Sequence, residues 1–310
     1  MKSPIRFILL FIVFISITSF NKFSSPNNPI AYYSDYFVFI ADDGGAPLVI
    51  PADINWSPSE QGYKTEFKVW YGTKGNWPIG YFKKDIASEG SDIPKEAWEH
   101  KNNSFFKFNT TSREIISKIQ DAPEVRFKIP NAEEWVLMPK NTNAKEKKIY
   151  GFRTTASVKG KTRTGWMIYE RIRWGKEKVK DFGDFESFYW IPLVIQGQFY
   201  HFEQHKGIQT ATKWSLEESK IVVETIPGFT LKTIDTSSDA ISKRKNIPKI
   251  IQVIAPEWNL DITLKSIGGQ VGHGAMFPKG LAYYRQSLLK STKDSHSSGY
   301  GMLELILENN

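Results

Sequence analysis

The sequence contains no cysteine among its 310 residues. Disulfide bonds, zinc sites built from thiolates and thiol nucleophiles are therefore excluded. Two common catalytic motifs are missing as well, because neither Gly-x-Ser-x-Gly nor His-Glu-x-x-His occurs. Their absence argues against serine-hydrolase and metalloprotease activity. We accordingly expect neither a metal ion nor an organic cofactor.

The sequence has only a small excess of positive charge. The chain has 41 lysines and arginines against 33 aspartates and glutamates, which gives a formal net charge of +8. The basic residues are scattered among acidic ones, apart from short clusters at Lys145–Lys148 and Lys243–Lys245. A nucleic-acid groove would need a basic stripe with interleaved aromatic rings. No such stripe is present, so we expect no nucleic-acid partner.

Long hydrophobic runs are limited to one, from Phe7 to Phe20 near the N-terminus. This run is shorter than the roughly 20 residues that span a bilayer comfortably. Lys2 and Arg6 precede it, and a polar, turn-rich segment follows at Asn21–Pro29. The pattern predicts a signal peptide over residues 1–25 and an exported protein, periplasmic or secreted. The alternative is an uncleaved leader that holds the protein at the membrane surface.

Helical periodicity is scarce, whereas short aromatic and β-branched runs broken by Gly, Pro, Asn and Asp recur throughout. This pattern predicts an all-β, antiparallel protein. Two short helices are expected, at Pro94–Trp98 and Ser112–Lys118. The expected strands are Tyr36–Ile40, Leu48–Ile50, Thr65–Tyr71, Val125–Ile129, Trp135–Met138, Tyr150–Val158, Thr164–Ile172, Tyr189–Ile195, Gln198–Gln204, Lys220–Glu224, Thr230–Ile234, Lys249–Ile254, Leu260–Lys265, Leu281–Lys290 and Tyr300–Leu307.

The sequence also repeats itself, with the same landmarks in the same order in each half. A Glu-Trp pair precedes a strand, and a later segment has glycine, then an aromatic residue, then glutamate five places after the glycine. A glycine-rich loop, residues 268–280, lengthens the second copy. The matched landmarks are Glu134-Trp135 with Glu257-Trp258, Gly165 with Gly299, and Glu170 with Glu304.

The repeat predicts two domains, at residues 30–178 and 183–310, joined by the charged, glycine-flanked linker Gly175–Gly183. Each half holds many antiparallel strands. Closing such a sheet into a barrel removes the exposed edges that a long flat sheet would present. We therefore expect two tandem antiparallel β-barrels.

Several segments resemble the two-domain, lipocalin-like superfamily of hydroxyneurosporene synthase (carotenoid 1,2-hydratase) and the AttH-type secreted proteins. The resemblance covers roughly residues 120–307, with its main motifs at Phe188–Leu193, Gln198–Phe202, Pro256–Leu264 and Gly299–Leu305. It implies two calycin-type barrels and a site for an elongated apolar molecule. The first domain of this family often ends with Asp-His before Trp-Gly, where this sequence has Glu170-Arg171.

Two functions follow from these features, and a third stays open. The first is binding of a hydrophobic small molecule such as a lipid, polyene or terpenoid-like compound, within aromatic-lined barrels. The second is an enzyme that acts on such a substrate, either a lyase of the hydratase kind, a cyclase or an isomerase. The third is a cell-envelope interaction protein without a small ligand.

The candidate site residues combine proton-handling groups with aromatic rings. Alternation along one expected strand puts His201, Glu203 and His205 on one face and Tyr200 and Phe202 on the other. Histidine and carboxylate side chains are the usual general acids and bases. The catalytic candidates are Glu170, Tyr169, Arg171, His201 and Glu203, and the ligand-binding candidates are Trp166, Tyr189, Trp190, Tyr200, Phe202, His205 and Tyr284.

Overall fold

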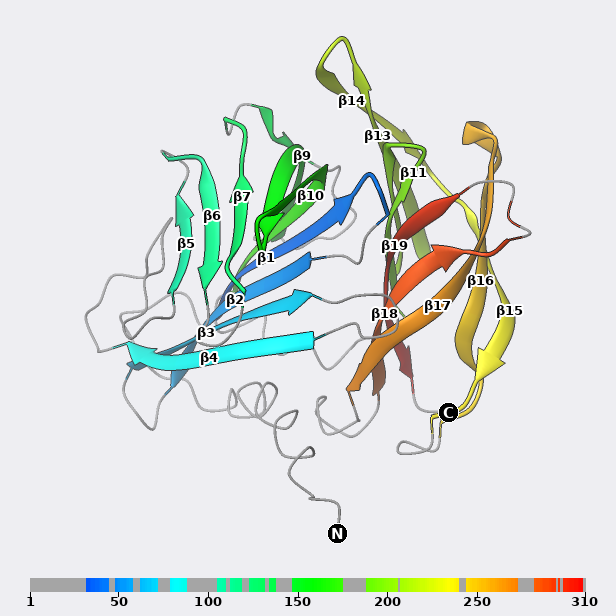
Figure 1. Cartoon of the computed structure of the whole chain (residues 1–310). Coiled ribbons are helices and arrows are strands. Elements are labelled where there is room, and N and C mark those ends of the chain that lie inside the picture. The colour runs from blue at the N-terminus through cyan, green and yellow to red at the C-terminus, as the bar shows by residue number, and fades with distance from the viewer. Residues whose placement is uncertain are drawn as a thin grey trace.

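The computed structural model describes residues 32–44, 48–57, 62–71, 79–87, 105–109, 112–118, 123–131, 134–137, 147–174, 188–205, 207–239, 244–272, 282–293, 295 and 298–308. These residues form two antiparallel β-sheets with no α-helix among them. The described residues are therefore all-β, and each half of the chain forms one sheet. Figure 1 shows the two curled sheets standing side by side as half-barrels.

The first sheet has ten strands in the order β4-β3-β2-β1-β10-β9-β7-β6-β5, with the short β8 attached to β9. Its central strands, β1, β10 and β9, are long and carry most of the core rings that the structure describes in this sheet. The bounds are β1 (Tyr32–Ala41), β2 (Leu48–Ser57), β3 (Gly62–Tyr71), β4 (Ile79–Ala87), β5 (Phe105–Asn109), β6 (Glu114–Lys118), β7 (Val125–Lys128), β8 (Val136–Leu137), β9 (Lys147–Val158) and β10 (Lys161–Trp174).

The second sheet has nine strands in the order β14-β13-β12-β11-β19-β18-β17-β16-β15. A single turn of 3-10 helix, η5 (Pro256–Trp258), lies between β16 and β17. The bounds are β11 (Phe188–Ile195), β12 (Gln198–His205), β13 (Ile208–Glu217), β14 (Lys220–Ile226), β15 (Thr230–Ser237), β16 (Ile247–Ala255), β17 (Leu260–Gly272), β18 (Ala282–Ser291) and β19 (Gly299–Glu308).

The two sheets have the same strand order once the extra β8 is set aside. The repeated landmarks also occupy matching register positions, because each closing glycine pairs with the last residue of the first strand of its half. The equivalent cross-strand pairs are Ala41 with Gly165 and Ile195 with Gly299, then Tyr36 with Glu170 and Trp190 with Glu304.

Tight turns join consecutive strands in both halves. The β9–β10 turn uses Lys159 and Gly160, with φ angles of 51° and 74°, and the β11–β12 turn uses Gln196 and Gly197, at 52° and 78°. Two consecutive positive φ angles are typical of the type I′ hairpin turn, whose twist matches that of the flanking strands. The Lys-Gly and Gln-Gly dipeptides therefore fix the register of the central hairpins.

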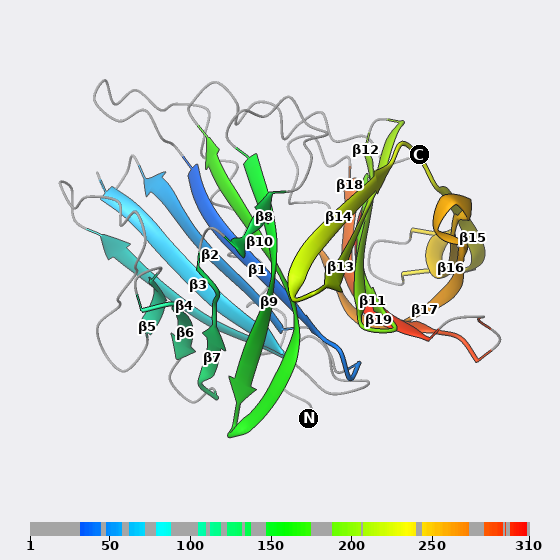
Figure 2. The ribbon, with the colours of Figure 1, turned by 90° about the horizontal axis from the view of Figure 1, so that it is seen from above.

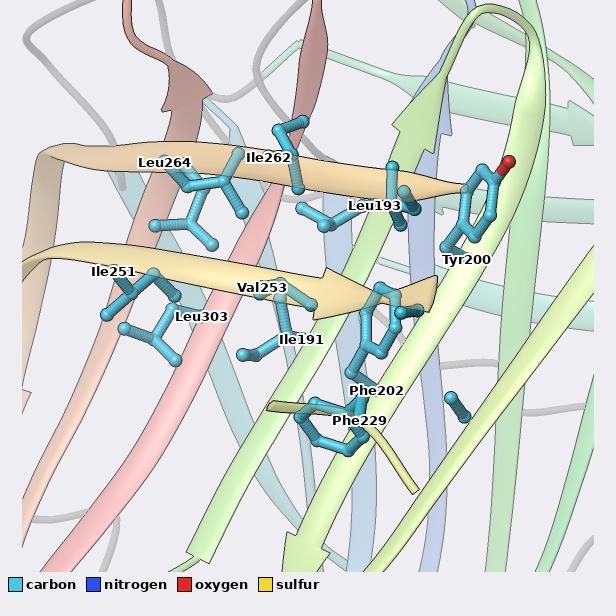
Figure 3. Close-up of a cluster of buried hydrophobic side chains, with 14 of the residues drawn as sticks. Ile191, Leu193, Tyr200, Phe202, Phe229, Ile251, Val253, Ile262, Leu264 and Leu303 are labelled. Atoms are coloured by element: carbon cyan, nitrogen blue, oxygen red, sulfur yellow. The ribbon is translucent and has the colours of Figure 1, made fainter. Parts of the chain in front are cut away.

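Successive residues of a strand face opposite sides of the sheet, and the hydrophobic side chains on these faces form three cores. One lies on the concave face of the first sheet and includes Phe37, Phe39, Met167 and Tyr169. A second fills the concave face of the second sheet. The close-up in Figure 3 shows its aliphatic side chains from β11, β16, β17 and β19 pointing toward one another. Figure 2 shows how the second sheet curls when it is seen from above.

The third core lies between the sheets and is built from their convex faces. It includes Val38, Ile40 and Trp166 from the first sheet and Phe199 and Trp214 from the second. The indole nitrogen Nε1 of Trp166 donates a hydrogen bond of 2.9 Å to the carbonyl oxygen of Gly197, across the interface. The two domains therefore share a buried apolar interface.

The structure corrects several expectations about the elements. Residues 112–118 form a turn followed by β6 and not a helix, because Ile115, Ile116 and Ser117 are buried between two neighbouring strands. The first residues of the expected glycine-rich loop, 268–272, extend β17. Strands β4, β5 and β13 were not expected at all.

Other expectations fall on parts of the chain that the structure does not describe. The helix Pro94–Trp98, the rest of the glycine-rich loop, the leader and most of the linker lie outside the described residues. The exact domain boundaries therefore stay a prediction. Among the described residues, no helix combines the length and hydrophobicity needed to cross a membrane.

Candidate functional site

The structure distributes the predicted site residues over three places. Tyr169 lies on the concave face of the first sheet, and Tyr200 and Phe202 lie on the concave face of the second. Trp166 and Trp190 lie in the core between the sheets. The side chains of His205 and Tyr284 lie outside the described part of the structure.

The concave face of the first sheet carries a buried acid that the sequence analysis did not single out. Asp35 on β1 is 1% exposed and Tyr169 on β10 is 2% exposed. The phenol of Tyr169 donates a hydrogen bond of 2.7 Å to Oδ1 of Asp35. A buried carboxylate is costly unless it is hydrogen-bonded or paired. The hydrogen bond from Tyr169 therefore offsets part of the cost of burying this acid among apolar side chains.

Aromatic rings surround the Tyr169 side of this pair. The Tyr169 ring contacts those of Phe37, Phe108, Tyr150 and Trp135, with centroid distances of 4.7, 5.3, 5.7 and 5.8 Å. Such ring pairs add roughly 0.5–1.5 kcal/mol each beyond the area they bury. Trp135 and Tyr150 are only partly buried, so they form the exposed side of the cluster.

Trp135, the residue just before β8, lies over this cluster. Its ring stacks on Phe152 at 5.2 Å and on Phe108 at 6.1 Å, with interplanar angles near parallel at 21° and 23°. Its indole nitrogen donates to the backbone oxygen of Pro130 at 3.2 Å. Trp258, its counterpart in the repeat, contacts Tyr200 and Phe202 in the second sheet.

Arg171 is the cation nearest in register to the buried acid. It lies directly opposite Asp35 on the paired strands β1 and β10, so both side chains leave the same face of the sheet. Arg171 is partly buried. Opposite charges placed across neighbouring strands attract each other.

Glu170 points away from Tyr169 and Arg171, because successive residues of a strand face opposite sides. It lies opposite Tyr36, and the Tyr36 ring contacts Trp190 of the other sheet at 6.3 Å. Glu203 and Glu304 flank Trp190 on its two neighbouring strands. The structure therefore brings Glu170 and Glu203 to the same convex interface.

His201 joins this group at the interface. Its ring lies 5.4 Å from that of Trp190, and its side chain is 2% exposed, whereas Glu203 is 7% exposed. Both face away from the concave interior that holds Tyr200 and Phe202. Three of the five catalytic candidates thus lie between the domains, while Tyr169 and Arg171 lie inside the first one.

Trp166 has a structural position. Besides its bond to Gly197, its ring is covered by the guanidinium of Arg153 at 4.9 Å. Arg153 forms a two-pronged ion pair with Asp42, with nitrogen–oxygen distances of 2.7 and 2.5 Å. A guanidinium that matches a carboxylate in this way holds a fixed geometry. This arrangement holds the β1–β2 turn against the interface, and it places Trp166 between the two domains. Its predicted part in ligand binding stays a prediction.

The tyrosines of the second sheet are shielded from water. Burial raises the pKa of Tyr189 above its ordinary value, and Arg244 offsets part of that rise. Burial likewise raises the pKa of Tyr200, against a smaller opposing effect of Lys213. The Tyr200 phenol donates to Oε1 of Gln198 at 2.8 Å. Both phenols are therefore held in the neutral form.

The sequence analysis missed Asp35 and used Trp135 only as a repeat landmark. A usable signal was present, because Asp35 precedes Phe37 and Phe39 at the spacing of one strand face. An acid among alternating inward-facing rings marks a buried polar group. Among the described residues, no three histidines, aspartates or glutamates lie close enough together to hold a metal ion.

Comparison with known proteins identifies the fold. No protein-family model matches the sequence, and no curated protein is found to be similar. Several solved structures are similar over nearly the whole chain. An AttH-type protein from Nitrosomonas europaea is 14% identical, with 91% of this chain and 93% of that chain covered and a TM-score of 0.49.

Kievitone hydratase from Nectria haematococca is 12% identical, covers 92% and 91% of the two chains and has a TM-score of 0.42. CghA, solved with Sch210972, is 9% identical, covers 91% and 90%, and has a TM-score of 0.51. At such low identity the likeness to CghA concerns the fold alone. The chain thus has the two-domain, lipocalin-like fold that its sequence motifs resemble.

Proposed function

We propose that this chain is an exported binding protein for a hydrophobic small molecule, and that the molecule binds at the concave face of the first sheet. The observation that carries the proposal is the aromatic cluster around the buried Asp35–Tyr169 pair. Binding sites for small molecules are mostly apolar and aromatic, with a few polar groups that fix orientation. CghA, which shares the fold, was solved with Sch210972, and this supports small-molecule binding as one use of the fold.

The two concave faces differ in a way that favours the first. The core of the second sheet is dominated by closely packed Ile, Leu and Val side chains, as Figure 3 shows. The first face instead carries more buried rings, among them Phe37, Phe39 and Phe152. A fully buried serine whose Oγ has no hydrogen-bond partner among the described atoms occurs on both faces, at Ser117 and at Ser287. The rings, and not these serines, therefore favour the first face.

The experiment is native mass spectrometry of the purified protein, followed by fluorescence titration with the apolar probe 1-anilinonaphthalene-8-sulfonate. We expect a co-purified apolar compound and quenching of tryptophan emission on binding. Trp135→Phe should remove most of that quenching. Trp258→Phe, the matched change in the second sheet, should leave it in place. Equal loss in both variants, or no ligand and no binding, would reject this site.

A second candidate function is proton-transfer catalysis of the hydratase or isomerase kind between the domains. The observation in its favour is that Glu170, Glu203 and His201 converge around the contact between Tyr36 and Trp190. Glu170→Gln keeps the shape and removes the charge. An enzyme would lose turnover of a co-purified compound while still binding it. A binding protein would keep the compound unchanged.

Export is the third part of the proposal, and it rests on Lys2, Arg6 and the apolar run that follows them. N-terminal sequencing of protein from the extracellular or periplasmic fraction should find a first residue between Asn21 and Pro26. Protein that still begins at Met1 and stays with the membrane fraction would favour the uncleaved leader instead. Failure to find any ligand in exported protein would favour the envelope interaction role.

A further inference from the structure

The contacts between the two domains come in equivalent pairs. Trp166 and Tyr300 each directly follow the closing glycine of their own half. The Trp166 indole donates to the carbonyl oxygen of Gly197, in the turn after β11 of the second half. The Tyr300 ring lies against Gly44, in the turn after β1 of the first half, and leaves no room for a Cβ there. Each aromatic residue therefore meets the first turn of the other half.

The cations that cover these two rings repeat in the same way. Arg153 is opposite Trp166 on the β9–β10 pair, and its guanidinium lies 4.9 Å from a ring centre. Lys290 is opposite Tyr300 on the β18–β19 pair, and its ammonium lies 5.5 Å from the ring centre. A cation at such a distance from the face of a ring is attracted to it. Both halves thus bring a cation, an aromatic ring and a turn glycine to equivalent places in the interface.

Tyr36 and Trp190 show where the symmetry axis of this arrangement lies. They are equivalent positions of the repeat, because each occupies the same place in the first strand of its half and pairs with the equivalent glutamate. Their rings contact each other, with centroids 6.3 Å apart. In a twofold arrangement, a residue that contacts its own equivalent lies at the axis. An approximate twofold axis therefore passes between Tyr36 and Trp190.

An interface of this kind uses nearly the same surface twice, so it is complementary to itself. Its buried contacts do not require that the two halves belong to one chain. They would be the same if the first half of one copy packed on the second half of another copy. The closed monomer is favoured by the tether between the halves, which acts as an effective concentration of about millimolar for a short flexible linker.

We propose that the convex faces of the two halves are docking surfaces for a second copy of this chain, and that two copies form a dimer by exchanging halves. Trp166 of one copy then meets Gly197 of the other, and Tyr300 meets Gly44 in the same way. Such an exchange costs little, because every contact of the monomer is formed again between the chains. It is independent of the proposed binding function, since each concave face stays within one half.

The test uses the absence of cysteine, because engineered single cysteines can then report contacts between chains. One mature full-length chain carries Thr164→Cys, and a second carries Gly197→Cys. Both positions are exposed, and a Cβ at Gly197 would meet no atom within 4 Å. Thr164 lies on the same strand face as Trp166, which reaches Gly197. A short bis-maleimide therefore joins the two chains when their halves have exchanged.

The two chains are unfolded together in guanidinium, refolded and then treated with the reagent. We expect the yield of cross-linked dimer to rise at least about tenfold as the refolding concentration increases from about 10 µM to about 1 mM, because the tether then loses its advantage. Chains that are refolded separately and mixed afterwards should give at least about tenfold less product, because exchange requires the buried interface to open.

Two controls establish what the product means. A single chain that carries both Thr164→Cys and Gly197→Cys should cross-link internally, which shows that the reagent spans the interface. Gly207→Cys replaces Gly197→Cys in the negative control. Gly207 has a φ of 75°, close to the 78° of Gly197, and equally open space, but it lies in the turn at the other end of β12. It should give only the background of random collisions.

Absence of a product between chains at the higher concentration, when the doubly substituted chain cross-links internally, would overturn the proposal. Equal yields with Gly207→Cys and Gly197→Cys would overturn it as well. Circular dichroism checks the folding of each variant. If a variant does not fold, or the reagent does not reach, light scattering on the refolded wild type decides. A dimer that persists on dilution supports exchange, whereas a monomer at every refolding concentration, or a dimer that dissociates at once, contradicts it.

Discussion

At the scale of single residues, neighbours in the chain have separate roles because they face opposite sides of a strand. Tyr169 and Arg171 face the interior of the first domain, whereas Glu170 between them faces the second domain. A motif that runs through consecutive strand residues therefore does not describe one site. The pairing of β10 with β1 determines which residues share a site, since it places Asp35 opposite Arg171 and Tyr36 opposite Glu170.

Gly151 shows how one missing side chain shapes the interface. A Cβ added there would lie 2.0 Å from ring atoms of Trp214, whose side chain is fully buried and stacked on Phe199 at 4.6 Å. The indole has no room to move, so Gly151→Ala should destabilise the protein by about 1–3 kcal/mol. Guanidinium unfolding curves would measure this change in the free energy of unfolding.

The matched control for Gly151 is Gly228→Ala. The nearest atom to a Cβ at Gly228 is Oε1 of Gln209, at an ordinary contact distance of 3.7 Å. This variant should stay within about 0.5 kcal/mol of the wild type. Equal stability of the two variants would mean that Trp214 does not pack against the β9 backbone as described.

Tyr200 gives a prediction about pH. Burial raises its pKa above the ordinary value of 10.0, so the folded protein favours the neutral phenol more than the unfolded chain does. The resulting stability is present below that ordinary value and is lost as the pH rises through the higher pKa of the folded state. Between about pH 8 and about pH 11, the wild type should lose more unfolding free energy than Tyr200→Phe.

Urea unfolding at the two pH values measures the difference for Tyr200. At about pH 8 the free energy of unfolding of the variant should be roughly 1 kcal/mol lower than that of the wild type, because the variant loses the hydrogen bond to Gln198. Tyr189 is a second buried phenol in both proteins, so both should still lose some free energy of unfolding at alkaline pH. An identical alkaline loss in wild type and variant would show that Tyr200 does not contribute.

At the scale of elements, the terminal strand β15 carries the features that protect an exposed edge. It pairs only with β16, and the register shifts between Thr233 and Asp235, which leaves Ile234 as the extra residue of a bulge. Lys249 pairs with Asp235 at 3.0 Å across the two strands. Bulges and charges at an edge discourage pairing with other chains.

Ile234 is the large hydrophobic residue that this edge leaves in contact with solvent, because its side chain is 55% exposed. Ile234→Lys should lower aggregation, measured by light scattering on heating, and should change the unfolding free energy by less than about 0.5 kcal/mol. Ile251→Lys on β16 is the contrast, since Ile251 is 1% exposed and its charge would be buried. A large loss of stability in Ile234→Lys would show that this residue is part of the core.

At the scale of the whole molecule, the two domains are joined by an interface as well buried as either interior. The shared core includes Trp166, Trp190 and Trp214, and the Trp166–Gly197 hydrogen bond crosses it. An apolar interface of this kind makes the stability of each half depend on the other. Relative motion of the domains is the usual expectation only when their interface is small or polar.

We therefore expect the mature protein to unfold in a single calorimetric transition. Trp214→Ala should remove about 3–5 kcal/mol of packing from the shared core and separate the unfolding of the two halves into two transitions. Phe127→Ala, inside the first domain, should lower the temperature of the transition without splitting it. Two well-separated transitions in the wild type would contradict the coupling of the domains.

The sequence by itself determined the fold class, the repeat and most central strands. Alternating apolar residues define strands locally, and the Lys-Gly and Gln-Gly turns define hairpins, so neither depends on distant contacts. The expected helix at Ser112–Lys118 was wrong because a segment of seven residues has too little periodicity to distinguish helix from strand. Residues Glu114–Lys118 form a strand because they pair with β5 and β7.

The composition of the site was decided only by the tertiary structure. Sequence alternation grouped Tyr200 with Phe202 and His201 with Glu203, but it could not say which concave or convex face each group meets. Asp35 and Tyr169 are 134 positions apart in the chain, and only the antiparallel pairing of β1 with β10 brings them within a hydrogen bond. Strand register is a property of the whole sheet, which is why the local pattern did not reveal the pair.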